Sequence, residues 1–427
     1  MQVQVKAAFY QCFGGINFME ADFNVLDFKT LITQHLGSRS HQAVYSYADV
    51  IKHLLLMFAI GGDVLDDLNT LQAQLHDHPY LSICSPDTVE YVCNQLKTVT
   101  RCQLTDKGVQ HQINEHEDFN KLLAVISVAG ATLTTKDAYT LDYDGHILEN
   151  TKQDNACNYK HTCSYYPVVC SINKLPVYMQ NRNGNTPESY EHLGIVQQAI
   201  AHCRALQLKV VKFRADACCY EHKTLQWLEA NNVLYYIRAD MNAGLRIALE
   251  DEPEWKPAML GYRQVEVCSI TEQLFGCKEP ERRIVAYRYK VAGQLSIEDG
   301  SGGYRYYAIV TNDQQSSAQH CIAFYNQRGC EGEHHFKELD HDFGWNKLPF
   351  DNLATNTIYM YMTVVAYLLF NVFKMRYAKR CSFVRTEMRL KNFILHFVTL
   401  TAKWIKTGRQ HILKLFTHKD YSAVWGT

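Results

Sequence analysis

Three carboxylates that are far apart in the sequence have the local settings of a divalent-metal site. Asp144 comes near the end of the alternating segment AYTLDYDGHI, and Asp216 closes a second one, LKVVKFRAD, so each acid is expected at the end of a strand. Glu333 stands at the start of a segment whose apolar residues recur at helical spacing. If the two strands are neighbours, both aspartates project at one edge of the sheet, and the helix carries the glutamate to the same place.

Such a set of carboxylates favours Mg²⁺ or Mn²⁺, because these cations prefer oxygen ligands and keep open positions for water and phosphate oxygens. Two ions ~3.5–4 Å apart can activate a nucleophile and stabilise the leaving oxygen of a phosphodiester. Each acid taken alone has a simpler explanation, since aspartate at a strand end is often a turn or helix cap and glutamate on a helix is usually solvated. The set of three therefore carries the prediction of a two-metal site for phosphoryl transfer.

The elements that hold these acids follow the order β-β-β-α-β. The strand that contains Asp144 is followed by two short apolar runs, PVVCSI and LPVYM, which Asn173 and Lys174 separate as in a tight hairpin. A helix around residues 193–200 leads into the strand that Asp216 closes, and a further helix and the strand VLYYI come after it. This order predicts an α/β fold with a mixed sheet flanked by helices.

The segments on either side of this core have different sequence patterns. Residues 1–135 are expected to be mostly helical, with Ser85 and Pro86 as the N-cap and first turn of one helix. Residues 240–317 contain β-branched and aromatic runs separated by turns, which predicts a β-rich insertion. The longest uncharged run, 352–373, has a strongly apolar part shorter than the ~20 residues of a membrane span, so a buried core helix and no membrane contact are expected.

Charge is distributed unevenly along the chain. The whole sequence carries a net charge of −1, but residues 374–427 hold 12 Lys and Arg against only Glu387 and Asp420. A basic tail on an acidic body indicates a polyanionic partner, although a basic and merely solvated helix would have the same charge. Apolar residues between 390 and 405 recur at helical spacing, which predicts one packed face and a row of outward cations along phosphates. The cations expected to contact DNA are Lys403, Lys406 and Arg409.

Three segments resemble the acidic blocks of DDE transposases from bacterial cut-and-paste insertion sequences, which have an RNase H-like catalytic core. These segments are LDYDGHILENTKQDNACNYKHTCSYYPVV, FRADACCY and YNQRGCEGEHHFKEL. The resemblance covers residues 138–375, with NRNGN and the late apolar helix included. These transposases commonly carry a β-rich insertion between the second aspartate and the glutamate, and 117 positions separate Asp216 from Glu333 here. The resemblance implies an RNase H-like fold and the chemistry of DNA transposition.

Carried onto matching positions, the resemblance implies that Asp144, Asp216 and Glu333 are the catalytic carboxylates that bind two Mg²⁺ or Mn²⁺ ions. Asp142 lies on the same strand face as Asp144 and is its rival, but the family acid closes the strand. Glu331 is the rival of Glu333, although the pattern E-x-x-F-K-E-L matches the family better from Glu333.

The family signature on the third acidic segment is a tyrosine, an arginine, the glutamate and then a lysine. Tyr325, Arg328 and Lys337 resemble its other members, and the resemblance implies that they grip DNA phosphates near the cut. The pattern departs from the family in one extra residue between Arg328 and Glu333, and in Asp340, which stands where the family usually has its lysine.

These observations predict five segments with different tasks. The predicted segments are a helical DNA-binding domain at 1–135, the first part of an RNase H-like core at 136–239, a β-rich insertion at 240–317, the second part of the core at 318–380, and a basic helical region at 381–427.

The expected function is that of a DNA transposase, which binds the terminal inverted repeats of its element in double-stranded DNA and works as a homodimer. The N-terminal sequence lacks a basic region followed by an apolar core, so the protein is expected in the cytoplasm, at the nucleoid, with reduced cysteines. Two alternatives stay open. A metal-dependent nuclease or resolvase on the same core would cut without joining, and a catalytically silent DNA-binding protein would do neither.

Overall fold

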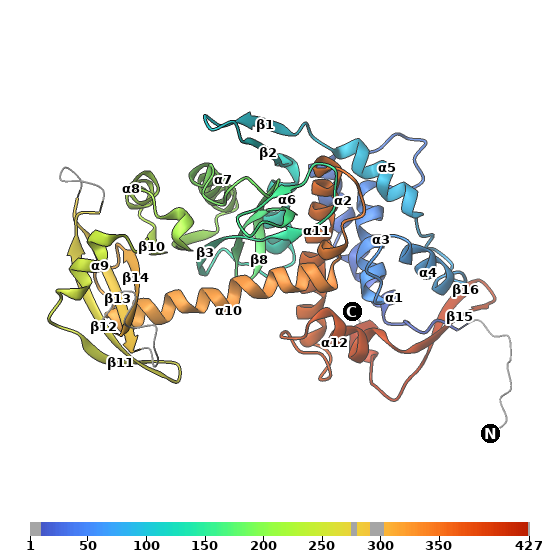
Figure 1. Cartoon of the computed structure of the whole chain (residues 1–427). Coiled ribbons are helices and arrows are strands. Elements are labelled where there is room, and N and C mark those ends of the chain that lie inside the picture. Colours follow the sequence, from blue (N-terminus) through green and yellow to red (C-terminus); the bar gives the residue numbers. More distant parts are fainter. Residues whose placement is uncertain (1–9, 275–279, 291–302, 426–427) are drawn as a thin grey trace, which may run out of the picture.

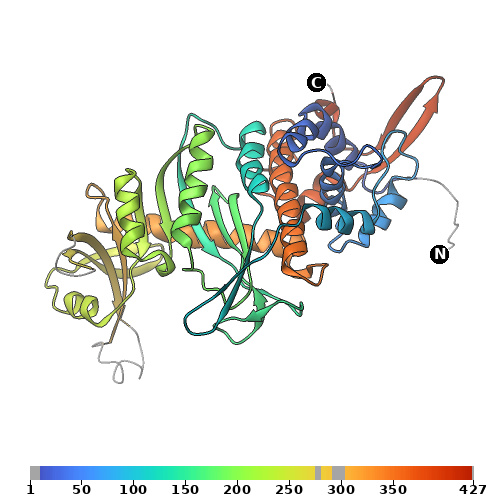
Figure 2. The same cartoon turned by 90° about the horizontal axis from the view of Figure 1, so that it is seen from above.

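The computed structural model describes residues 10–274, 280–290 and 303–425; the side chains of residues 330–334 and 425 lie outside this description. The chain forms an elongated α/β molecule with one long mixed sheet (Figure 1). The N-terminal helices and the C-terminal segment lie together at one end, and the strands after residue 255 lie at the other; the view from above keeps this arrangement (Figure 2). The predicted α/β class, a mixed sheet flanked by helices, is confirmed.

Five strands in the middle of the sheet form the predicted core, in the sheet order β8-β7-β3-β9-β10. Strand β3 is antiparallel to β7 and parallel to β9, which is in turn parallel to β10. One helix, α7, connects β8 to β9, and another, α8, connects β9 to β10, as in an RNase H-like fold. The bounds are β3 Ala138–Gly145, β7 Val168–Ile172, β8 Leu175–Arg182, α7 His192–Ala205, β9 Lys209–Ala215, α8 His222–Ala230 and β10 Leu234–Arg238.

The predicted hairpin between β7 and β8 is confirmed. Asn173 and Lys174 have φ angles of 51° and 69°, so both central residues of the turn are left-handed. A two-residue turn of this kind matches the right-handed twist of the flanking strands, and asparagine accepts a positive φ better than most residues. A small side sheet of β4 (Leu148–Glu149), β5 (Ala156–Cys157) and β6 (Cys163–Tyr165) lies between β3 and β7 along the chain.

The segment predicted as a β-rich insertion contains strands that extend the core sheet. Strand β14 pairs antiparallel with β10, and β13, β12 and β11 follow outward in antiparallel order. Helix α9 covers one face of these strands, where Leu245 and Leu249 pack against Cys268, Ile284 and Ala286. The bounds are α9 Ala243–Glu250, β11 Lys256–Leu260, β12 Arg263–Glu272, β13 Arg282–Lys290 and β14 Tyr304–Thr311.

The opposite edge of the sheet is formed by a hairpin within a region predicted as mostly helical. Strands β1 (Arg101–Leu104) and β2 (Gln110–Asn114) pair with each other, and β2 continues onto β8. The turn contains Gly108 at φ 75°. The mostly helical segment 1–135 thus includes one hairpin that was not predicted from the sequence, in which Asp106, Lys107 and Gly108 form a turn between two extended runs.

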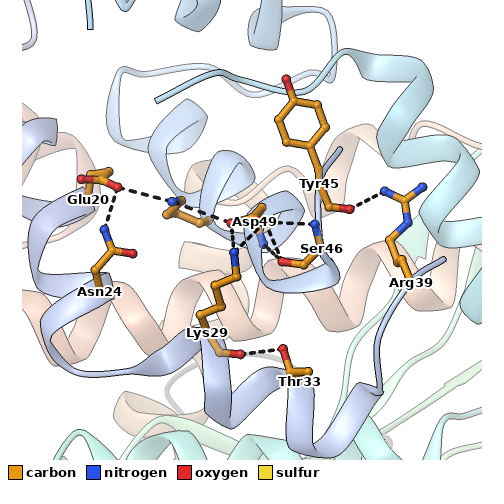
Figure 3. Close-up of polar contacts among 9 residues, drawn as sticks. Glu20, Asn24, Lys29, Thr33, Arg39, Tyr45, Ser46 and Asp49 are labelled. Carbon is orange, nitrogen blue, oxygen red and sulfur yellow. Dashed lines mark hydrogen bonds and ion pairs between the residues drawn. The ribbon is translucent and has the colours of Figure 1, made fainter. Parts of the chain in front are cut away.

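The rest of the described N-terminal region is mostly helical, as predicted, and the helices that begin after Ser46, Ser85 and His116 have side-chain N-caps. Ser85 accepts a hydrogen bond from the backbone N–H of Thr88 at 3.3 Å, with Pro86 in the first turn. At α3, Ser46 and Asp49 form a capping box, and Lys29 Nζ lies 3.2 Å from Asp49 Oδ2 (Figure 3). The bounds are α1 Ile16–Val25, α2 Phe28–Leu36, α3 Tyr47–Ala59, α4 Asp67–Gln74, α5 Pro86–Leu96 and α6 Glu117–Ala129.

Two long helices join the parts of the molecule. Helix α10 (Ala318–Asp342) runs from the strands of the insertion to the centre of the molecule (Figure 1). Helix α11 (Leu353–Ala378) is long and apolar enough to cross a membrane, but 89% of its most apolar window is buried in the protein. It packs against α3, α5, α6 and β8. The predicted buried core helix is thus confirmed.

The C-terminal region departs from the predicted helix. Helix α12 (Leu390–Phe393) and a π turn over 394–398 bury Leu390, Phe393 and Phe397, as the spacing predicts. Beyond them, however, β15 (Thr401–Thr407) and β16 (Gln410–Phe416) form an antiparallel hairpin, followed by α13 (Ser422–Trp425). The prediction of a helix through residues 401–416 is wrong, because Gly408, with φ 61°, allows a tight turn and side-chain burial alternates along β16 as in a strand.

Candidate active site

The two aspartates predicted as metal ligands lie at the ends of adjacent parallel strands. Asp142 of β3 is paired in register with Arg214 of β9, so Asp144 and Asp216 both come two residues further along. Asp216 Oδ1 accepts a hydrogen bond from the backbone N–H of Cys218 at 3.0 Å and caps the short 3₁₀ helix 217–219. The predicted arrangement, with both acids at one sheet edge, is what the strand pairing produces.

The rival aspartate, Asp142, is occupied by a buried ion pair. Its carboxylate accepts hydrogen bonds from Arg214 Nε at 2.7 Å and Arg214 Nη2 at 2.8 Å. The two side chains are only 3% and 2% exposed. Because a bidentate guanidinium neutralises the carboxylate, Asp142 is a poor cation ligand. The geometry therefore favours Asp144, the residue preferred from the sequence.

Arg328 of α10 reaches the same sheet edge. Its Nη2 donates to Asp144 Oδ1 at 2.8 Å and to the backbone carbonyl of Tyr143 at 3.0 Å. The Arg328 Nε is buried and has no hydrogen-bond partner among the described residues. Tyr325, one helical turn earlier, is partly buried and packs against the hydrophobic cluster of the insertion strands. Both signature residues thus lie beside the aspartates.

The third carboxylate cannot be placed by its side chain. Glu333 and its rival Glu331 lie on the described backbone of α10, but their side chains fall outside the described residues. Lys337, the predicted phosphate contact, is exposed on the same helix. Asp340, where the family usually has its lysine, forms a hydrogen bond of 2.7 Å between its Oδ2 and His146 Nε2. This pair joins α10 to the loop after β3, so the departure at Asp340 has a structural partner of its own.

One carboxylate of the site was missed from the sequence. Glu188 lies in the loop between β8 and α7, only 9% exposed, and its ligand oxygen, an oxygen of Asp216 and the sulfur of Cys218 all lie within 4.8 Å of one another. Tyr166 Oη donates to Glu188 Oε2 at 3.2 Å. The only sequence signal was the neighbouring segment NRNGN, which belongs to the family resemblance but does not contain the acid.

The electrostatics of this edge favour a bound cation. Burial raises the pKa of Asp144, with Arg328 lowering it and Asp216 adding to the rise. Burial also raises the pKa of Glu188 to about 7, with contributions from Asp216 and Asp144. Three carboxylates therefore face one guanidinium, whose own pKa is raised by these acids despite its burial.

The donor set fits Mg²⁺ or Mn²⁺. Oxygen ligands from several carboxylates are what these cations prefer. Glu188 Oε1 is buried and faces no stronger donor than the Cys218 thiol among the described residues, which is the state expected of an oxygen that serves a cation. A cation here would offset the repulsion among the acids, since an opposite charge close by favours the ionised form.

The predicted DNA contacts of the C-terminal region lie elsewhere. Lys403 is on β15, with its Nζ 5.2 Å from the ring centre of Tyr10, whereas Lys406 and Arg409 are exposed toward the tip of the hairpin. The hairpin lies at the end of the molecule opposite the insertion (Figure 1). These cations are therefore not brought to the aspartates, and a contact with DNA would be made on a separate surface.

An RNase H-like sheet with aspartates at the ends of its first and fourth strands, and an arginine-bearing helix across them, defines the class of DDE proteins. Residues 13–425 match the family model described as transposase DDE domain group 1, and the chain belongs to this family. No curated protein matches the chain. A solved structure that resembles it is the cryo-EM structure of the piggyBac transposase synaptic complex with hairpin DNA, with 9% sequence identity, a TM-score of 0.44, and coverage of 91% of this chain and 80% of that chain.

Proposed function

We propose that the protein is the DNA transposase of a bacterial insertion sequence, which cuts and joins DNA by metal-dependent phosphoryl transfer. The observation that carries this proposal is the convergence of Asp144 and Asp216 at neighbouring strand ends, beside Arg328 of α10. Membership of the DDE transposase family supports it. The substrate is double-stranded DNA, first at the ends of the element and then at a target.

The carboxylates hold the cations of the reaction. Asp144 and Asp216 are the two metal-binding aspartates, and Glu333 is the third metal-binding acid, supplied by α10. Two divalent ions bound to such carboxylates supply the charge that activates an oxygen nucleophile and stabilises the leaving oxygen of a phosphodiester. The first nucleophile is water, and the second is the 3′ hydroxyl that the first cut releases.

Side chains of α10 hold the phosphate. Arg328 is fixed by Asp144 and by the Tyr143 carbonyl, so its planar guanidinium is oriented before DNA arrives. Tyr325 and Lys337 on the same helix supply further contacts to the DNA backbone near the cut.

Recognition of the element ends is assigned to other surfaces. The N-terminal helices and the exposed cations Lys406 and Arg409 of the C-terminal hairpin contact the DNA, together with Lys403, and phosphate contacts set most of the affinity. Two copies of the chain bring the two ends together. The protein acts in the bacterial cytoplasm, at the nucleoid.

The proposal is tested by cleavage of a duplex that carries one end of the element, with MgCl₂. Wild type is compared with Asp144→Asn, Asp216→Asn, Glu333→Gln and Glu331→Gln, and Glu338→Gln serves as a matched control because it is another partly buried glutamate of α10. We expect both aspartate variants and Glu333→Gln to lose cleavage and the control to retain it. Loss in Glu331→Gln alone among the glutamate variants would move the third ligand to Glu331.

Joining is tested separately with pre-cut ends and a target plasmid. A protein that cuts but never joins would be a nuclease or resolvase, and the transposase proposal would fail. A protein that binds the ends but neither cuts nor joins with Mg²⁺ or Mn²⁺ would be a catalytically silent DNA-binding protein.

A further inference from the structure

Glu188 is buried at the sheet edge that carries the aspartates, but the three-carboxylate DDE mechanism assigns no role to it. It comes from the loop between β8 and α7, whereas the two aspartates come from β3 and β9. The backbone of Gly145, the residue after Asp144, leaves room for it: a Cβ on Gly145 would lie 2.9 Å from Glu188 Cδ and 2.7 Å from Tyr166 Cε2. The glutamate is thus packed directly against the end of the strand that carries Asp144.

The two carboxyl oxygens of Glu188 have different surroundings. Oε2 accepts the hydrogen bond from Tyr166, which fixes the rotation of the carboxyl group. Oε1 faces no stronger donor than the weakly donating Cys218 thiol among the residues described, although the side chain is more than nine-tenths buried. Leaving a buried polar atom unsatisfied costs about 1–3 kcal/mol, and more for a charged group. A ligand that occupies Oε1 would remove this cost.

The neighbours of Glu188 indicate which ligand that is. An Asp216 oxygen and the Cys218 sulfur lie within 4.8 Å of the Glu188 oxygen, a separation that a single cation can bridge. Burial raises the pKa of the Cys218 thiol well above its usual value, so the two carboxylates supply the negative charge. Arg328 makes its direct contact with Asp144, so among the described residues one guanidinium is shared by three acids, and Glu188 and Asp216 have no cation in direct contact.

We propose that Glu188 is a metal ligand of the catalytic centre, and that with Asp216 it binds a divalent cation of the Mg²⁺ or Mn²⁺ type. The inference rests on the proposed function, because it adds a fourth carboxylate to the same centre. A purely structural glutamate, held by Tyr166 alone, is the competing explanation. The two differ in whether the side chain matters for metal binding in the absence of DNA.

The experiment measures Mn²⁺ binding to the full chain without DNA, from the electron paramagnetic resonance signal of free Mn²⁺ during a titration with MnCl₂. Loss of a residue that only supports a metal ligand weakens metal binding about tenfold or more. Loss of a ligand itself should weaken Mn²⁺ binding at least as much. We therefore expect Glu188→Gln to weaken binding about tenfold or more, as Asp216→Asn does. Glu338→Gln, at a partly buried glutamate with an unpartnered oxygen of its own, should bind Mn²⁺ like wild type.

Two further variants separate ligation from packing. Glu188→Asp keeps a carboxylate, so it should bind Mn²⁺ more tightly than Glu188→Gln does. Tyr166→Phe removes only the hydroxyl donor and should weaken binding less than Glu188→Gln. Equal losses in Glu188→Asp, Glu188→Gln and Tyr166→Phe would mean that the packing of the loop is what matters, and the inference would be overturned.

The outcomes also separate this inference from the proposed function. If Asp216→Asn loses Mn²⁺ binding and DNA cleavage while Glu188→Gln binds Mn²⁺ like wild type, the inference fails and the transposase proposal stands. If neither variant changes Mn²⁺ binding, and Asp216→Asn also cleaves DNA normally, both fail.

Discussion

The buried pair of Asp142 and Arg214 offers a test of which aspartate of β3 is structural. Asparagine at 142 keeps the shape of the side chain but removes the carboxylate that pairs with buried Arg214. Breaking a buried ion pair in this way costs about 3–5 kcal/mol. Arg214 Nη1 still donates to the Phe324 carbonyl at 2.9 Å, which keeps one of its contacts. We therefore expect Asp142→Asn to destabilise the protein by about 3 kcal/mol, at the lower end of that range.

The corresponding change in melting temperature follows from the size of the chain. Unfolding entropy is about 2.1 cal/mol/K per residue, or about 0.9 kcal/mol/K for a chain of this length that unfolds as one unit, so Tm should fall by about 3 °C. Differential scanning calorimetry measures this fall. Asp144→Asn is the matched comparison. Asp144 also pairs with an arginine, Arg328, but its side chain is 22% exposed against 3% for Asp142, and Arg328 keeps its bond to the Tyr143 carbonyl. Asp144→Asn should therefore lower Tm by less than Asp142→Asn does while it abolishes cleavage.

The reasoning fails if the two variants exchange their effects. Asp142→Asn with an unchanged Tm would show that the ion pair does not stabilise the fold. A drop in Tm for Asp144→Asn as large as that for Asp142→Asn would make Asp144 a structural residue. In that case the proposal that Asp144 is a metal ligand would be wrong.

Three other predictions address charge at the site and on the hairpin. The pKa of Glu188 is raised from 4.5 to about 7 in the folded chain, so its contribution of about 3 kcal/mol to the free energy of unfolding is present below pH 4.5 and is lost as the pH rises through 7. The Tm of metal-free wild type should therefore fall more between pH 5 and pH 8 than the Tm of Glu188→Gln, and saturating MgCl₂ should remove the difference. Arg328→Lys keeps the charge but replaces the planar guanidinium by one ammonium, which cannot hold Asp144 and also offer a phosphate a second nitrogen in fixed geometry. Cleavage should therefore fall at least about tenfold while end binding in gel shifts stays within about threefold, and equal losses of binding and cleavage would contradict a role at the cut. Replacing Lys406 and Arg409 together by alanine should lower the slope of log affinity against log salt by up to about 1.8 and leave Mn²⁺ binding unchanged; an unaltered slope would exclude the hairpin tip from the DNA interface.

Much of the core could be predicted because its signals are local. The alternation in AYTLDYDG and the pair Asn173 and Lys174 each specify a strand or a turn from a few neighbouring residues. The position of Asp144 and Asp216 followed from these strand ends. Their catalytic role stays a prediction, as does that of Glu333.

Other features depend on contacts that the sequence does not display. The choice between Asp142 and Asp144 depends on Arg214, whose partner is decided by strand register. Glu188 reaches the site through the closure of a loop, and its sequence spacing from the aspartates carries no periodic signal. The C-terminal hairpin was missed because the consecutive apolar residues Trp404 and Ile405 fit a helical stripe as well as a strand.

Helix α10 connects the insertion strands to the sheet edge that carries Asp144 and Asp216. Tyr325 is seated among the insertion strands, and Arg328, one turn away, touches Asp144. Adding or removing a single residue in this stretch would turn everything beyond it by about 100°. The length of α10 between Tyr325 and Asp340 is therefore constrained more than its exposed side chains are, and any tilt of the outer strands would move Arg328 relative to Asp144.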